Sequence, residues 1–168
     1  AFNSQKKRVG FISSLMGGDE PHGLLVLDIM RSLKNLFDFY VVSIGSKPLS
    51  EEFVHHASGV FAVGYDEVSA KNVLKSLELD CLVYAESMNS PIVYFLGYQR
   101  FAHIQILVQG SPVTSGIPTF DYFVSGDLLE HPFRTQLVDD HYSEQLILFD
   151  GQAISFPDTQ VHFLQDSS

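Results

Sequence analysis

Short apolar runs alternate with amphipathic stretches along most of the chain, and this alternation constrains the fold more than any other feature of the sequence. A short apolar run predicts a buried strand, and an apolar period of about 3.6 residues predicts a helix that packs on one side. Strands that alternate with helices are typical of a parallel sheet covered on both faces. The sequence therefore predicts an α/β fold: a doubly wound, mostly parallel Rossmann-like sheet of about five to seven strands.

The predicted elements are short and follow one another closely. One helix is predicted over residues 22–36, where apolar side chains recur with the helical period. The residues of this stripe are Leu25, Ile29, Leu33 and Leu36. Ser50 and Asp66 are suited to begin two further helices, because their side-chain oxygens can accept hydrogen bonds from free N–H groups. A proline start predicts a fourth helix over residues 91–99. The predicted strands are 8–13, 37–45, 59–65, 80–85, 103–109, 120–125 and 145–149.

The length of 168 residues is that of one ordinary domain, and the 45% of hydrophobic residues suffices for a packed core. We predict a linker over residues 1–6, a Rossmann-like lobe over 7–156 and a tail over 157–168. No stretch reaches the roughly 20 apolar residues of a membrane span, so we expect no membrane partner. The one cysteine, Cys81, is predicted to pack within its strand. A single cysteine excludes an internal disulfide and fits a reducing compartment, cytoplasmic or nuclear.

The negative charge is confined to the second half of the chain. Residues 1–75 contain eight basic and eight acidic side chains, whereas residues 76–168 contain two basic and twelve acidic ones, which gives the net charge of −10. A nucleic-acid surface needs a positive field, so we expect no nucleic-acid partner. Arg100 and Arg134 alone also give little support to a complete diphosphate site, although backbone N–H groups can bind phosphate.

Ligands of open parallel sheets collect beyond the carboxyl ends of the strands, and two loops there carry the main candidate residues. His22 lies at the start of the helix after the first strand, where an imidazole can act as a general base or bind a hydroxyl. A solvent-facing histidine in a flexible turn is the alternative. The second loop has a glycine at each end and hydroxyl side chains between them. Such a loop can offer hydroxyls and N–H groups to a sugar or phosphate, and a simple turn is the alternative. Its residues are Gly110, Ser111, Pro112, Val113, Thr114, Ser115 and Gly116.

Other candidate residues give weaker signals. Glu86 follows the fourth predicted strand and can serve as a catalytic carboxylate, but we favour capping of the next helix as its role. His55 and His56 are adjacent in sequence and point in different directions, so they cannot form the spaced pair that a metal needs. His131 and His141 flank carboxylates, and a solvated acidic loop is the favoured interpretation. The chain contains no dinucleotide fingerprint, no P-loop and no Gly-x-Ser-x-Gly elbow.

Several short motifs occur in an order that resembles one enzyme family. Residues 8–14 read R-V-G-F-I-S-S, residues 110–116 read G-S-P-V-T-S-G, and residues 142–146 read Y-S-E-Q-L, with I-Q at 104–105 and D-Y at 121–122 between them. This ordered set resembles the first lobe of the catalytic region of the O-GlcNAc transferase family, which has G-Y-P-G-T-S-G and Y-S-E-K-L in the corresponding places. The resemblance covers most of residues 7–150.

The resemblance implies a GT-B glycosyltransferase, in which two Rossmann-like lobes face each other across a cleft. Such an enzyme is inverting, needs no metal or other cofactor, and transfers a sugar from a UDP-GlcNAc or GDP-fucose type of donor to Ser and Thr hydroxyls of a protein acceptor. This chain would be the first lobe, inactive without the second. The resemblance further implies that His22 lines the active-site cleft and that the 110–116 loop lies near the sugar or the acceptor. We expect both to open onto the same edge of the sheet.

A second functional hypothesis stays open at this point. The chain has Leu77-Glu78 where the family has D-G, and residues 87–91 read S-M-N-S-P where the family has G-Y-T-K-G, with its lysine. These departures are typical of a degenerate, non-catalytic Rossmann-like module that binds a ligand or another protein. A further α/β lobe downstream, with a lysine for a diphosphate, would favour the enzyme.

Overall fold

The structure is a computed structural model, and it describes residues 6–17, 20–86, 90–108, 114–130 and 142–151. It contains a 7-stranded sheet in the order β3-β2-β1-β4-β5-β6-β7, and each neighbouring pair is parallel. The strands are β1 (Lys7–Ser13), β2 (Phe37–Ile44), β3 (Gly59–Val63), β4 (Leu79–Tyr84), β5 (Ala102–Val108), β6 (Tyr122–Gly126) and β7 (Gln145–Phe149). The prediction of a doubly wound parallel α/β sheet is confirmed.

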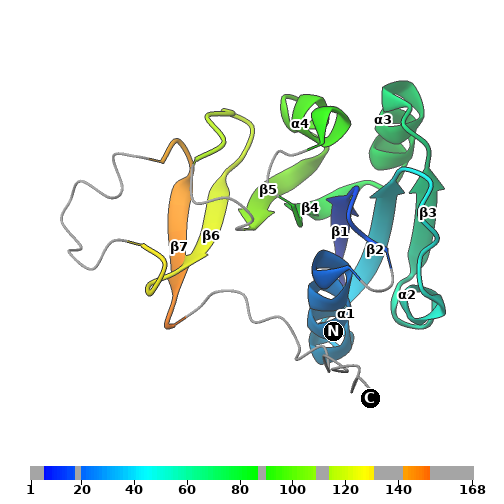
Figure 1. The fold of residues 1–168 in the computed structure, drawn as a ribbon, viewed down its shortest axis with the longest axis horizontal. Helices are drawn as coiled ribbons and strands as arrows, with labels where there is room; N and C mark the ends of the chain where they lie inside the picture. The colour runs from blue at the N-terminus through cyan, green and yellow to red at the C-terminus, as the bar shows by residue number, and fades with distance from the viewer. Residues whose placement is uncertain (1–5, 18–19, 87–89, 109–113, 131–141, 152–168) are drawn as a thin grey trace, which may run out of the picture.

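The described residues also form helices α1 (Pro21–Leu33), α2 (Glu51–His56), α3 (Glu67–Ser76) and α4 (Pro91–Gly97). Helices α1 and α2 lie on one face of the sheet, and α3 and α4 lie on the other (Figure 1). Phe11 and Val83 pack on the α1–α2 face, whereas the adjacent residues Ile12 and Leu82 pack on the α3–α4 face. Because both faces of these strands are buried, their sequences are continuous apolar runs.

Strand β1 lies inside the sheet and pairs with β2 on one side and β4 on the other. Phe11 lies beside Val41 of β2 and Val83 of β4. The chain adds β2 and β3 toward one edge, crosses through α3 to β4, and adds β5, β6 and β7 toward the other edge. The strand order therefore reverses between β1 and β4. The crevice outside the carboxyl ends of these two strands is where open α/β sheets bind their ligands.

Two helix starts follow the expected chemistry to different degrees. Asp66 accepts hydrogen bonds from the backbone N–H groups of Val68 at 3.1 Å and Ser69 at 3.3 Å, so its predicted capping of α3 is confirmed. Ser50 occupies the corresponding position before α2, but its hydroxyl makes no capping hydrogen bond. The short helix α2 is therefore held by packing, with Phe53 fully buried, rather than by its cap.

Helix α1 buries a different stripe from the predicted one. The buried residues are Gly23, Val26, Leu27 and Met30. The residues of the predicted stripe are half-buried or, beyond the helix end, exposed: Leu25, Ile29, Leu33 and Leu36. Because nearly every position from 23 to 30 is apolar, the sequence allows two stripes. The close approach of Gly23 to the backbone of Met16 and Gly17 selects the observed one.

The connection from β5 to β6 returns along the sheet without a helix in the residues that the structure describes. Strands β5 and β6 are parallel, so this connection must run from the carboxyl end of β5 to the amino end of β6. Ile117 and Phe120 of the returning segment are buried on the α3–α4 face. No helix of the described part of the chain is long and apolar enough to cross a membrane.

Candidate functional site

The polar side chains at the point where the strand order reverses form a buried cluster of one carboxylate and two hydroxyls. Glu86 follows β4 and is 1% exposed. The Ser13 hydroxyl donates to its Oε2 atom at 3.0 Å, and the Ser14 hydroxyl lies 3.1 Å from Oε1 and 3.0 Å from Oε2. Ser13 Oγ also accepts a hydrogen bond from the backbone N–H of Leu15 at 2.8 Å. The cluster therefore joins the carboxyl ends of β1 and β4.

The strand register explains why these side chains meet. Ile12 of β1 lies beside Tyr84 of β4, and the backbone N–H of Ala85 donates to the carbonyl oxygen of Ile12 at 3.1 Å, so the two segments leave the sheet side by side. Within the described ranges, no Lys or Arg lies within ion-pair distance of Glu86. A buried carboxylate held by hydroxyls suits a sugar or acceptor hydroxyl, which can donate to it, better than a phosphate, which it repels.

His22 lies in the first turn of α1, the helix that follows the carboxyl end of β1, and its side chain is half-buried. The start of this helix is fixed by Gly23, because a Cβ atom there would lie 2.6 Å from the carbonyl oxygen of Gly17. The structure thus places His22 at the same end of the sheet as Glu86, and not in the hydrophobic core. An imidazole at this end can exchange a proton with a hydroxyl bound at the crevice.

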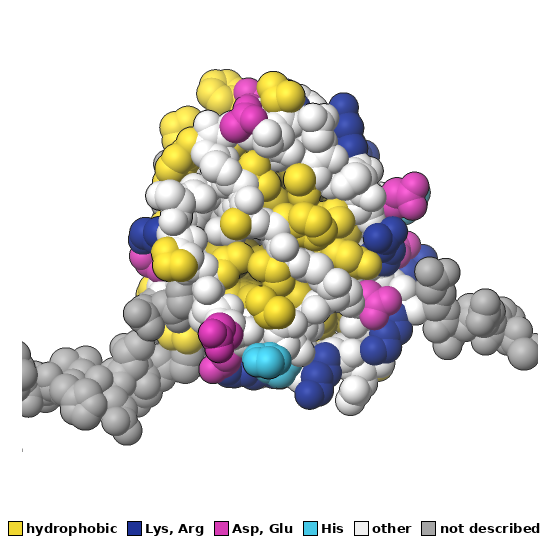
Figure 2. All heavy atoms as spheres, turned by 90° about the vertical axis from the view of Figure 1, so that its right-hand side faces the viewer, with side chains coloured by type: hydrophobic (Ala, Val, Ile, Leu, Met, Phe, Trp, Pro, Cys, Tyr) yellow, Lys and Arg dark blue, Asp and Glu magenta, His cyan; other side chains and the backbone are white. Residues whose placement is uncertain are grey.

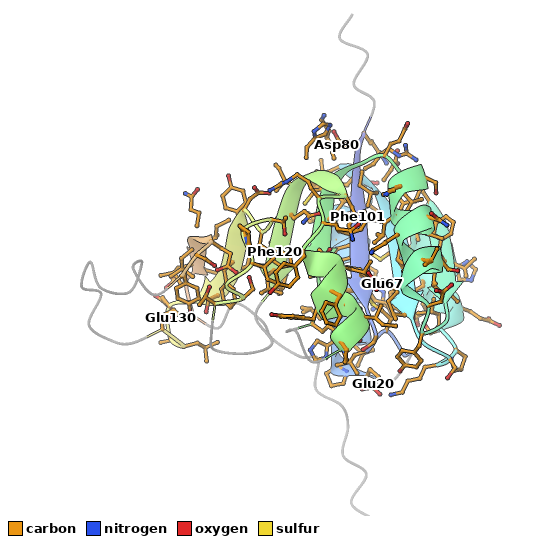
Figure 3. The ribbon with its side chains drawn as sticks, turned by 90° about the horizontal axis from the view of Figure 1, so that it is seen from above. Glu20, Glu67, Asp80, Phe101, Phe120 and Glu130 are labelled. Carbon is orange, nitrogen blue, oxygen red and sulfur yellow. The ribbon has the colours of Figure 1, made fainter. Side chains whose placement is uncertain are left out.

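The loops that follow β1, β2 and β3 meet beside this crevice. Glu20, after β1, forms a salt bridge with Lys47, after β2. Gly45 has a φ of 119° and lies close to the Tyr65 ring, so a Cβ atom on residue 45 would be 3.2 Å from that ring. The hydrogen bond and the charge of Lys47 lower the pKa of Glu20, and those of Glu20 raise the pKa of Lys47. Figure 3 shows Glu20 at one end of the strands and Asp80 at the other.

The hydroxyls of the 110–116 loop contact a second buried carboxylate. Glu144 is 5% exposed and accepts hydrogen bonds from the Thr114 hydroxyl at 2.6 Å, the Ser115 backbone N–H at 3.0 Å and the Ser115 hydroxyl. Ser143 adds a hydroxyl contact to Thr114 at 2.9 Å. Burial raises the pKa of Glu144, but the hydrogen bonds from Ser115 and Thr114 outweigh it, so the pKa lies below its ordinary value. Glu144 therefore holds this loop as a carboxylate.

The strand register gives the height of the 110–116 loop along the sheet. Glu144 immediately precedes β7, so Thr114 and Ser115 lie at the amino end of that strand. Strands β6 and β7 begin level with Ile106 of β5, which is level with Phe11 of β1, so the amino end of β7 is level with the carboxyl half of β1. That Thr114 and Ser115 open onto the same edge as His22 stays a prediction. Gly116 is exposed beside them. Gly110, Ser111 and Pro112 lie outside the described residues.

Other sequence-based expectations have mixed outcomes. The prediction that Glu86 caps the next helix is wrong, since Ser90 occupies the capping position of α4 and Glu86 bonds Ser13 and Ser14. Cys81 is partly buried, and burial raises its pKa to about 11, which makes it an unreactive thiol. His131 and His141 lie outside the described residues. In the part of the chain that the structure describes, no group of three or more His, Cys, Asp or Glu side chains could hold a metal ion.

Sequence reasoning missed the roles of Ser13, Ser14 and Glu144. The signal for the serines is their position. Ser13 and Ser14 lie at the carboxyl end of the first strand, and Glu86 follows the fourth strand, which is the neighbour of the first in the sheet. Glu144 belongs to the Y-S-E-Q-L run that carries the family resemblance. No periodicity or spacing links that run to Thr114, because the contact depends on how the connection between β5 and β6 folds back.

The comparisons with known proteins identify the fold. No protein-family model matches the chain, and no curated protein matches its sequence. Among solved structures, 44 chains match. One is a mutant of the Thermobaculum terrenum O-GlcNAc transferase, with a TM-score of 0.67 and 17% sequence identity over 86% of this chain and 28% of that one. The chain thus has the fold of a GT-B glycosyltransferase lobe and spans well under half the length of that similar protein.

Proposed function

We propose that this chain is the first lobe of an inverting, metal-independent GT-B glycosyltransferase that acts on protein Ser and Thr hydroxyls. The single observation that carries the proposal is the buried cluster of Glu86, Ser13 and Ser14 at the reversal of strand order, with His22 at the same end of the sheet. The similarity in fold to an O-GlcNAc transferase and the ordered motifs support it. The single cysteine, Cys81, supports a cytoplasmic or nuclear location.

In this proposal the lobe binds hydroxyl groups and leaves the diphosphate of the nucleotide sugar to the second lobe. The carboxylate of Glu86 accepts a hydrogen bond from a sugar or acceptor hydroxyl when one of the two serine hydroxyls turns away from it. His22 contacts the acceptor hydroxyl and takes its proton late in the reaction, because a neutral imidazole is a far weaker base than an alkoxide. Gly110, Ser111 and Pro112, which directly follow β5, are proposed to approach the sugar through their backbone.

The test uses the full-length protein with a panel of labelled nucleotide sugars of the UDP-GlcNAc and GDP-fucose type. We expect transfer of label to protein Ser or Thr residues, and His22→Ala should lower the rate by roughly 10²–10⁴-fold with an unchanged melting temperature. Asp150→Asn, a change at the far end of β7, is the matched control and should leave the rate unchanged. Absence of transfer from every donor by a folded full-length protein would overturn the proposal.

The second candidate is a non-catalytic binding module, and one observation favours it. Both oxygens of Glu86 are already engaged by Ser13 and Ser14, so the cluster is satisfied within the lobe and needs no ligand. For this candidate, the full-length protein transfers no sugar, and Glu86→Gln changes stability without changing any binding. If the chain is the enzyme lobe, Glu86→Gln lowers the rate of sugar transfer by protein that remains folded.

A further inference from the structure

The two serines that contact Glu86 differ in how firmly the fold holds them. Ser13 is the last residue of β1, lies beside Ser43 of β2 in the parallel ladder and is fully buried. Its hydroxyl oxygen accepts the backbone N–H of Leu15 at 2.8 Å, and its hydrogen is donated to Oε2 of Glu86 at 3.0 Å. The hydroxyl of Ser13 is therefore engaged both as donor and as acceptor within the lobe.

The hydroxyl of Ser14 is held by Glu86 alone. Ser14 follows β1, outside the ladder, and is half-buried. Its hydroxyl oxygen lies 3.1 Å from Oε1 and 3.0 Å from Oε2 of Glu86, and it bonds no other described residue. A hydroxyl has one hydrogen, so Ser14 serves one carboxylate oxygen at a time. Rotation of this side chain can therefore release Glu86 without breaking another hydrogen bond of the described residues.

The Oε1 atom of Glu86 is the acceptor that depends on Ser14. The two oxygens of a carboxylate offer about four lone-pair sites. Ser13 contacts Oε2 only, so among the described residues Ser14 is the one donor within hydrogen-bond distance of Oε1. Oε1 thus lies next to the less buried of the two serines. It is the oxygen that a hydroxyl from the crevice can reach once Ser14 turns away.

We propose that Ser14 occupies the place of a substrate hydroxyl at Oε1 of Glu86 and is displaced when the substrate binds, a role that rests on the proposed function. The group that displaces it is a neutral hydroxyl, because a hydroxyl can donate to a carboxylate, whereas a carboxylate repels a phosphate. This hydroxyl belongs either to the donor sugar or to the acceptor Ser or Thr. Ser14 thus determines how tightly the substrate binds, while Ser13 keeps Glu86 in place.

Competition for Oε1 makes the affinity for substrate depend on Ser14. The substrate can bind only while Ser14 is turned away, so its apparent affinity is reduced by the fraction of time that Oε1 is free. Without the Ser14 hydroxyl, this oxygen faces water, which exchanges readily with a substrate hydroxyl. Removal of the hydroxyl should therefore strengthen substrate binding. Removal of a hydroxyl that merely supports the fold would leave substrate binding unchanged or weaken it.

Exposed apolar side chains gather on another side of the lobe, around the free edge of β3. They include Val54, Tyr65 and Val68. Figure 2 shows this side, with apolar side chains in the middle and charged ones around them. Strand β3 is separated from β1 by β2, so this face is distinct from the cluster at the ends of β1 and β4. Nothing in the described residues shows what covers it, so no partner is assigned to it.

The first test measures KM and kcat of the full-length protein with a labelled nucleotide sugar of the UDP-GlcNAc or GDP-fucose type and a Ser/Thr peptide. Ser14→Ala should lower one KM by about 3–10-fold with little change in kcat, because the substrate makes the new bond in both the ground state and the transition state. A lower KM for the nucleotide sugar assigns the hydroxyl to the sugar, and a lower KM for the peptide assigns it to the acceptor. Ser13→Ala makes the same chemical change one residue earlier and should lower neither KM. Ser76→Ala, which removes an exposed hydroxyl of α3, is the control. If Ser14→Ala lowers neither KM, the inference is overturned.

The second test needs no substrate. A double-mutant cycle in urea unfolding of this chain combines Ser14→Ala with Glu86→Met, which removes both carboxylate oxygens and keeps the length of the side chain. The coupling should change the unfolding equilibrium constant by about 3–10-fold and should match the fall in KM, because both measure the bond from Ser14 to Glu86. A coupling below about 2-fold would overturn the inference whether or not the full-length protein transfers sugar. A coupling of the expected size without transfer from any donor would overturn the proposed function, while supporting Ser14 as the occupant of Glu86.

Discussion

Thr114 donates a hydrogen bond to Glu144 across 30 positions of sequence, with 2.6 Å between Oγ1 and Oε2. The same carboxylate accepts from the backbone and the hydroxyl of Ser115, so one buried charge holds the returning connection against the start of β7. A charged acceptor makes stronger hydrogen bonds than a neutral one, and a buried one must be satisfied. The position of the loop therefore depends on the ionisation of a single side chain.

The first prediction concerns the pH dependence of this contact. Because the folded protein lowers the pKa of Glu144 below its ordinary value of 4.5, the carboxylate stabilises the fold above that pH. This stabilisation is lost as the pH falls through the folded-state pKa. Glu144→Gln should lower the free energy of unfolding by about 1–2 kcal/mol at pH 7, since a neutral amide replaces the charged acceptor. Urea unfolding of both proteins between pH 7 and pH 3 measures the difference.

The difference between wild type and Glu144→Gln should shrink as the pH falls below 4.5. Asp150→Asn serves as the control, because Asp150 is exposed. A difference that stays constant down to pH 3 would contradict this account, and would mean that the amide perturbs packing and not charge.

The second prediction concerns the loop before α1. Gly23→Ala should lower the free energy of unfolding by about 1–3 kcal/mol, because the new Cβ would lie 2.6 Å from the carbonyl oxygen of Gly17 and must displace the backbone. This loss is expected despite the roughly 1 kcal/mol that alanine gains over glycine in a helix. Gly64→Ala is the matched control: nothing lies within 4 Å of its Cβ, so this variant should be as stable as wild type or slightly more so. Thermal unfolding of both variants is the measurement, and a stabilised Gly23→Ala protein would refute the prediction.

The third prediction concerns the turn before β4, where the resembling family has glycine. Glu78 has a φ of 47°, a left-handed conformation that costs a side chain of this kind about 1–2 kcal/mol. Glycine loses more conformational entropy on folding than glutamate, which offsets part of the relieved strain. Glu78→Gly should therefore raise the free energy of unfolding by about 0.5–1 kcal/mol. The ion pair to Arg8 at 3.7 Å contributes little, because the Glu78 side chain is 84% exposed. Glu78→Ala removes the ion pair but keeps the strain, so chemical denaturation should show no gain for that variant.

The fourth prediction concerns a hydroxyl in the core. Tyr84 is fully buried beside Phe120, and among the described residues its hydroxyl has no hydrogen-bond partner. Burial alone raises the pKa of this phenol. Tyr84→Phe should raise the free energy of unfolding by about 1 kcal/mol, because it removes an unsatisfied polar group while the ring keeps its edge contact. Differential scanning calorimetry can measure this change, and a clear loss of stability would show that the hydroxyl has a partner.

Much of the fold follows from the sequence because both faces of the central strands are buried. The predicted strands 8–13 and 145–149 agree with β1 and β7 to within a residue, since apolar runs flanked by polar turns leave little freedom. The buried stripe of α1 could not be predicted in the same way. Residues 23–30 are apolar around most of the helix, and the choice of face depends on the contact of Gly23 with a loop.

The candidate site was predictable only in part. Its place at the carboxyl ends of the strands follows from the topology, and His22 lies there as expected. The partnership of Glu86 with Ser13 depends on which strand lies beside β1, and a local pattern such as a capping position does not carry that information. The contact of Thr114 and Ser115 with Glu144 depends on a connection between β5 and β6 that has no helix among the described residues, whereas helical connections are the usual expectation.

The place of β1 between β2 and β4 also governs how the chain can fold while it is being synthesised. Val9 pairs with Phe39 of β2 on one side and with Cys81 of β4 on the other. A ribosome that adds about 5–20 residues per second needs several seconds to make the residues between Val9 and Cys81. Throughout that interval, Phe11 and Ile12 lie on a strand with at least one open side. A strand that is interior in the finished sheet is thus an edge strand in the nascent chain, open to mispairing until β4 is made.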